Sequence, residues 1–154
     1  MAMTSPVTSG LAAGAAGITA LNLVSYLDMA VRGRPASSAP EQVVEAIAER
    51  LGVEIPGEGE VRQARLSALG ALAGIGAGVA VGLGAAVARR VACRPNTVAG
   101  ALGAGLAAMA AADVPMAALG VSDPRTWRLQ DWISDVVPHV AYGAVVEYVL
   151  DRRT

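Results

Sequence analysis

Four long runs of this 154-residue chain contain very few charged residues, and the segments between them hold most of the ionisable side chains. The runs cover residues 7–27, 66–88, 97–119 and 133–150. A helix of about 20 residues reaches across the roughly 30 Å of hydrocarbon in a bilayer. Apolar runs of this length are typical of a protein that crosses a membrane several times. The sequence therefore predicts an all-α, polytopic membrane helical bundle with about four transmembrane helices, forming a single domain over residues 1–154.

The composition and charge narrow the classes of partner and cofactor. Hydrophobic residues make up 54% of the chain and charged residues only 16%, whereas soluble domains are about a quarter charged. The formal net charge of −1 offers no basic field for nucleic acid. Neither the single cysteine, Cys93, nor the single histidine, His139, belongs to a cluster with metal-ligand spacing. We therefore expect the lipid bilayer as surroundings, and no nucleic acid, metal or cofactor.

The first run has a competing interpretation as a signal peptide. Residues 1–8 contain no Arg or Lys, and the apolar stretch is longer than the core of an ordinary signal peptide. We therefore expect residues 7–27 to span the membrane.

A polar connector, residues 28–65, separates the first two runs and carries a helix signal of its own. Ser38 supplies an N-cap and Pro40 stands at a permitted early position. Apolar residues then recur at helical spacing as far as Gly52. This pattern predicts a short amphipathic helix over about residues 40–52.

Glycines recur every fourth residue in the second run, and a small-residue stripe continues in the third. An interior glycine costs a water-exposed helix about 1 kcal/mol relative to alanine. In a bilayer, small residues instead let two helices approach closely. We predict that these glycines pack helices together, with a glycine-lined pore wall as the alternative. They are Gly70, Gly74, Gly78, Gly82 and Gly100.

Polar side chains within the runs are the candidate functional residues, because an ionisable group in a bilayer costs roughly 2.5–3.5 kcal/mol. At a rise of about 1.5 Å per residue, three of them are expected to share one layer. These are Asn22, Asp113 and His139. In the fourth run Asp135, His139 and Glu147 are spaced by multiples of four, so they share one helix face that should turn toward protein or water.

Two interpretations of this polar layer remain open. In the structural one, hydrogen bonds between the polar side chains fix helix register, each contributing about 0.6 kcal/mol. In the functional one, His139 titrates near neutrality beside Asp113 or Asp135, and Glu147 continues a proton route across the bundle.

The chain also has two halves of similar pattern. Each half has a small-residue run, a polar connector containing proline, and a second run that ends in Arg-Arg, at residues 89–90 and 152–153. A two-fold internal duplication would explain this pattern. Because each half would cross the membrane twice, the copies would be parallel.

Two stretches resemble segments of uncharacterised small four-helix membrane proteins from GC-rich actinobacteria. The first is LNLVSYLDMAVRGRP at residues 21–35 with SSAPE at 37–41, and the second is DPRTW at 123–127 with DVVPH at 135–139. The resemblance implies a multi-pass protein of a bacterial plasma (inner) membrane. It implies no activity and no functional residues.

Neither a nucleophile motif nor a phosphate-binding motif occurs in the chain. The leading hypothesis is therefore a non-enzymatic membrane protein, a structural or accessory component packed through small-residue stripes into a homo-oligomer or against a partner subunit. One alternative is a small proton-coupled transporter or channel that uses the polar layer. Another is a protein that binds a membrane lipid or quinone.

Overall fold

The computed structural model of the protein describes residues 5–91 and 96–153. The described residues form helices and short connections without any β-strand, which confirms the predicted all-α architecture. In chain order the elements are α1 (Pro6–Arg32), α2 (Ala39–Arg50), α3 (Gly59–Val91), α4 (Thr97–Leu119), the 3₁₀ turn η1 (Pro124–Thr126) and α5 (Leu129–Arg153).

Local sequence signals explain where α1 and α4 begin and end. The Ser5 hydroxyl accepts a hydrogen bond at 3.2 Å from a backbone amide in the first turn of α1. The Asn96 side chain accepts one at 2.8 Å from the amide of Ala99 in α4. Both side chains satisfy backbone donors that a helix start leaves free. The two helices end at Gly33 (φ 63°) and Gly120 (φ 74°), in the left-handed conformation that favours glycine.

Three helices, α1, α3 and α4, are long and apolar enough to cross a bilayer. The prediction of about four transmembrane helices is therefore wrong for the described residues. The fourth run, residues 133–150, is helical and lies within α5, but it does not reach the apolarity of the other three. The reason is its content of Asp135, His139 and Glu147, which lower its mean hydropathy.

The three apolar helices turn most of their side chains outward. Of the residues in the most apolar stretch of each helix, 28% are buried in α1 and 17% in each of α3 and α4. Large apolar side chains such as Leu23, Leu72 and Leu106 are exposed on these faces. A protein in water rarely leaves such extended apolar surfaces uncovered. The outer faces are thus suited to lipid.

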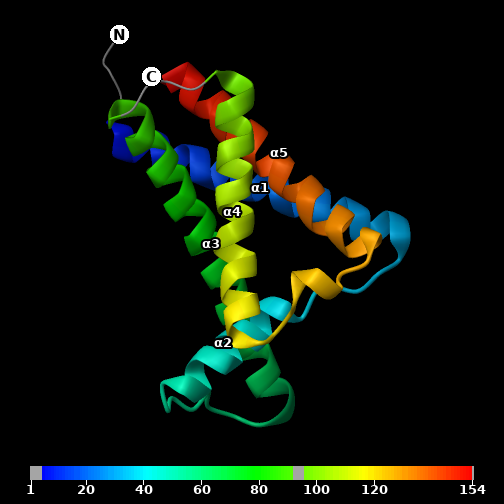
Figure 1. Ribbon diagram of the computed structural model, residues 1–154. Coiled ribbons are helices and arrows are strands. Elements are labelled where there is room, and N and C mark those ends of the chain that lie inside the picture. The colour runs from blue at the N-terminus through cyan, green and yellow to red at the C-terminus, as the bar shows by residue number, and fades with distance from the viewer. Residues whose placement is uncertain (1–4, 92–95, 154) are drawn as a thin grey trace.

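The most polar of the long helices, α5, is also the most enclosed. It packs against α1 on one side and α4 on the other, and α1 packs in turn against α3 (Figure 1). Tyr142, Val146 and Leu150 of α5 are fully buried and form the core with small residues of the other helices. The helix that is least suited to lipid therefore lies between helices that are suited to it.

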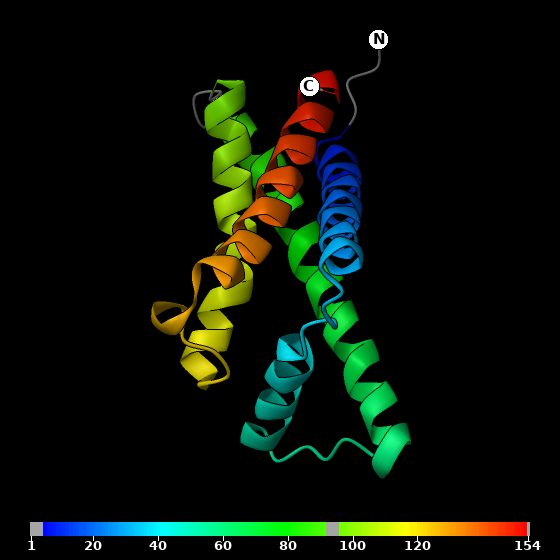
Figure 2. The same cartoon turned by 90° about the vertical axis from the view of Figure 1, so that its right-hand side faces the viewer.

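Figure 2 shows that α2 and the first part of α3 extend beyond the rest of the bundle. The helix α2 lies where the sequence of the connector predicts a short amphipathic helix. Polar contacts bind it to α3: Glu41 accepts hydrogen bonds from Gln63 and Ser67, both at 2.5 Å, and Glu45 pairs with Arg62 at 2.6 Å.

The long helices define two ends of the bundle. At one end, here called the Arg89 end, α1 and α4 begin while α3 and α5 end (Figures 1 and 2). At the other, here called the Asp28 end, α1 and α4 end and α5 begins. Each half of the chain repeats the order helix, connector, helix, and the internal duplication stays a prediction.

Candidate functional site

The polar face of α5 turns toward α4. The backbone carbonyl of His139 lies against Gly105, and the Glu147 carboxylate lies against Gly100, so that a Cβ at either glycine would collide with it. The side chains of Asp135 and His139 are 17% and 12% exposed, and that of Glu147 is 3% exposed. The face therefore lies in the interior, where it forms two separate clusters.

The first cluster, here called the Arg89 cluster, joins three helices at the Arg89 end. Arg89 of α3 forms an ion pair with Glu147 of α5, and the two side chains are 4% and 3% exposed. The same guanidinium nitrogen contacts Asp151 Oδ1 at 2.8 Å. The Thr97 hydroxyl, at the start of α4, donates to Asp151 Oδ2 at 3.4 Å. Glu147 is thus part of an ion pair that it shares with Asp151, and it does not belong to a cluster with Asp135 and His139.

Neither Arg89 nor Asp151 is among the candidate functional residues that the sequence indicates. Both stand at run ends, where Arg and Asp ordinarily face water or lipid headgroups. The sequence nevertheless contains a signal for this ion pair. When two helices end on the same side of a membrane, the charged residues near their ends lie at similar depth. Arg89 near the end of one run and Glu147 near the end of another satisfy that condition.

The second cluster, here called the Asp113 cluster, consists of Asp113 from α4 and of Asp135 and His139 from α5. His139 Nδ1 lies 2.8 Å from the backbone carbonyl oxygen of Asp135 and 3.3 Å from its carboxylate Oδ1. Asp113 is 9% exposed, and its charge interacts with both other groups. Asp113 Oδ1 and Asp135 Oδ2 are buried without a hydrogen-bond partner among the described residues.

Asn22, the third residue expected in this layer, is half-buried on α1. Within residues 5–91 and 96–153, no hydrogen bond joins it to Asp113 or His139. The structure brings together Asp113, Asp135 and His139, it places Glu147 in the Arg89 cluster, and for the described residues it shows no hydrogen bond between Asn22 and the Asp113 cluster.

The predicted glycine stripe of α3 serves several different contacts. Gly82 lies against the backbone of Gly14 in α1, and Gly78 lies against Ile18. Gly70 instead lies against Pro40 of α2, and Gly74 has no atom within 4 Å of a built Cβ. The stripe is therefore an α1–α3 contact over only part of its length.

A second close helix contact joins α4 and α5. A Cβ at Gly143 would collide with the carbonyl oxygen of Ala101 and lie 2.6 Å from the amide nitrogen of Gly105. Next to Gly143, the buried Tyr142 hydroxyl donates at 2.5 Å to the carbonyl oxygen of Gly78. In the chain, Gly143 lies between His139 of the Asp113 cluster and Glu147 of the Arg89 cluster, whereas Tyr142 packs toward α1 and α3.

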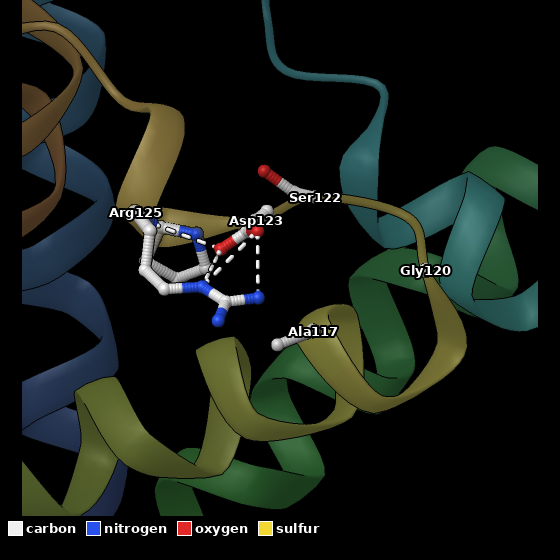
Figure 3. A pocket seen from close by; sticks show the side chains of 6 residues that line it. Ala117, Gly120, Ser122, Asp123 and Arg125 are labelled. Carbon is white, nitrogen blue, oxygen red and sulfur yellow. Dashed lines mark hydrogen bonds and ion pairs between the residues drawn. The ribbon is translucent and has the colours of Figure 1, made fainter.

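The hollows of the described surface lie at the Asp28 end and carry little chemistry. The one in Figure 3, about 380 Å³, lies where α4 ends. Its charged residues, Asp123 and Arg125, already pair with each other at 3.0 Å. The hydrogen bonds from Arg125 hold the pKa of the Asp123 carboxyl below its ordinary value. A similar open hollow of about 410 Å³ lies between α2 and α3, and no described group of side chains has the geometry of a metal site.

Comparison of the chain with protein-family models, with curated proteins and with solved structures gave no match.

Proposed function

We propose that this chain is a non-enzymatic integral membrane protein of a bacterial plasma membrane, where it is a structural or accessory component. The observation that carries the proposal is the combination of outward apolar faces with an interior closed by glycine contacts. The two hollows described above are open to the surface and differ in this from an enclosed small-molecule site. A packed bundle of this kind is suited to assembly more than to chemistry.

An uncovered small-residue stripe on α3 supports assembly with a second copy or with a partner subunit. A Cβ built at Gly76 or Gly84 meets nothing within 4 Å, and Ala80 between them is exposed. Small residues at this spacing let a neighbouring transmembrane helix approach closely. The stripe lies apart from Gly78 and Gly82, which already pack inside the bundle.

The test is native purification in mild detergent, followed by cross-linking and size-exclusion chromatography. We expect a homo-oligomer or a co-purifying subunit that is lost in Gly84→Leu. Ala110→Leu, which adds the same side chain to an exposed position on α4, should leave the assembly intact. A monomer that co-purifies with a lipid or quinone would contradict the proposal and favour a ligand-binding role.

A small proton-coupled transporter or channel is the second candidate. The observation that favours it is the pair of buried carboxylate oxygens without hydrogen-bond partners, on Asp113 and Asp135. Such a protein should carry protons across liposome membranes under a pH gradient, and His139→Ala or Asp113→Asn should abolish the flux while the protein stays folded.

A further inference from the structure

The Asp113 cluster carries an unbalanced charge in a mostly enclosed place. Two ionised carboxylates and one imidazolium have a net charge of −1. The cations of the neighbouring helices are engaged with other carboxylates: Arg32 pairs with Asp28, and Arg89 pairs with Glu147 and Asp151. Uptake of one proton removes the net charge, and burial strongly penalises a charge that is left unbalanced.

Asp113 gives independent evidence that the cluster is incomplete. The residue is 9% exposed, and its Oδ1 has no hydrogen-bond partner. A buried carboxylate oxygen normally accepts at least one hydrogen bond. A proton on this carboxyl group would make one of its oxygens a donor, and Asp135 Oδ2 is a buried acceptor that has no partner among the described residues.

The geometry also identifies the proton-binding atom of His139. Both groups next to Nδ1, the carbonyl oxygen and the carboxylate of Asp135, are acceptors. Nδ1 therefore carries the hydrogen in the neutral ring, and a further proton binds at Nε2. The charged groups that act on His139 are Asp135 on its own helix and Asp113 on α4; no described residue of α1 or α3 adds another.

The cluster is closed toward the Arg89 end. Between His139 and Glu147 lie about two turns of α5, roughly 12 Å. In this interval Gly143 is so close to Ala101 and Gly105 that not even a methyl group fits. At this level α4 and α5 therefore meet backbone to backbone, and the Arg89–Glu147 pair lies beyond the contact.

The cluster is nearer to polar groups at the Asp28 end. Asp135 is its most exposed member, with 17% of its side chain accessible. The neighbouring Ser134 accepts a hydrogen bond from Arg32, and its hydroxyl oxygen lies 2.9 Å from the Gln130 carbonyl oxygen and 3.5 Å from Asp28 Oδ2. Polar side chains therefore continue from the cluster to this end of the bundle.

We propose that Asp113, Asp135 and His139 form a proton-binding site between α4 and α5 that exchanges protons with the Asp28 end of the bundle only. The Gly105–Gly143 contact separates the site from the Arg89 end. The site goes beyond the proposed structural role and does not depend on it.

The test uses the only histidine and the only cysteine of the chain. Full-length protein labelled with ¹⁵N-histidine is reconstituted into liposomes, and the imidazole NMR signal of His139 is followed after a pH jump applied to the outer buffer alone. In the sequence, Cys93 lies between α3 and α4, the connection at the Arg89 end. The fraction of Cys93 that an impermeant thiol reagent labels gives the fraction of molecules in which this end faces outward.

In molecules whose Cys93 the reagent does not reach, the Asp28 end faces the outer buffer. We therefore expect the fraction of His139 whose NMR signal responds rapidly to the pH jump to equal the unlabelled fraction of Cys93. A response in every molecule, a response that follows the reactive Cys93 fraction, or no titration of His139 would each overturn the proposal. Proton flux above that of protein-free liposomes would also overturn it. None of these outcomes depends on whether the protein co-purifies with a partner.

Discussion

Arg89 is the side chain on which the Arg89 end of the bundle depends most directly. Its guanidinium is buried between two carboxylates of α5, and the glycine at position 100 leaves the space that Glu147 occupies. Removing one partner of a buried ion pair leaves the other charge uncompensated, which typically costs about 3–5 kcal/mol. Exposed ion pairs contribute about 1 kcal/mol or less.

We expect Arg89→Gln to lower the free energy of unfolding by about 3 kcal/mol. The thermal unfolding temperature measured in detergent should therefore fall markedly. The matched control is Arg90→Gln, at the adjacent exposed position, which should leave that temperature nearly unchanged. Adding Glu147→Gln to the Arg89→Gln protein should recover part of the loss. Equal effects of the two single variants would show that burial of the pair does not matter.

Asp113 should make the stability of the protein depend on pH. The proposed proton-binding site implies that the folded cluster holds one proton more than the same groups of the unfolded chain, whose carboxyl pKa is near 4. Since the folded state then binds more protons, its stability should rise as the pH falls from ~8 to ~5. We expect the unfolding temperature of the wild type to rise over this range, and that of Asp113→Asn to rise less. Parallel curves would contradict the role of Asp113.

At the scale of elements, the bundle depends on two close helix contacts made by glycine. The α1–α3 contact brings Gly82 against Gly14, and the α4–α5 contact brings Gly143 against Gly105. In both, backbone meets backbone, so dispersion contacts replace the apolar driving force that lipid does not supply. The polar face of α5 depends on the second contact for its enclosure.

We expect Gly82→Ala to destabilise the bundle by about 1–3 kcal/mol, the usual cost of overfilling a packed core. A Cβ at this position would lie 2.5 Å from the amide nitrogen of Gly14. Gly84→Ala, two residues along the same helix and in open space, should be neutral or slightly stabilising. Thermal unfolding in detergent measures both, and similar losses in the two variants would refute the assigned α1–α3 contact.

The same reasoning separates Gly74 from Gly78, which the sequence pattern treats as equivalent. Leucine at position 78 would collide with Ile18, whereas leucine at position 74 would project into open space. Gly78→Leu should therefore prevent folding of the bundle, and Gly74→Leu should fold. Circular dichroism and size-exclusion chromatography would show the difference.

At the scale of the whole molecule, polar groups are concentrated inside and at both ends, and apolar groups cover the sides. The helices α1 and α4 pack on two sides of α5, and the outer faces of α1, α3 and α4 are suited to lipid. This is the reverse of a soluble bundle, in which the outer faces are polar.

This arrangement predicts that the two ends face opposite sides of the membrane. Ser37, in the connection that follows α1, and Cys93, in the connection that follows α3, are separated by the single apolar helix α3. A cysteine introduced by Ser37→Cys, in a Cys93→Ser background, should react with an impermeant thiol reagent from the side opposite to native Cys93. Labelling of both from the same side in sealed, oriented vesicles would exclude the crossing of α3.

The sequence alone predicts the helices well because the signals for them are local. Hydrophobic runs indicate α1, α3 and α4, and α2 begins directly after the predicted N-cap Ser38, although the Ser38 side chain makes no capping hydrogen bond. The spacing of Asp135, His139 and Glu147 correctly places them on one helix face. Each inference uses neighbours within a few turns, which the order of residues determines directly.

The tertiary structure alone decided which partner each of these residues has. Nothing in the sequence distinguishes Gly74 from Gly82, because a glycine's contact depends on which helix lies opposite. The same holds for Glu147, whose partner Arg89 is 58 residues away in the chain. The tertiary structure also decided what surrounds α5. Hydropathy scores each segment as if lipid surrounded it, whereas α5 packs between α1 and α4, which shield its polar face.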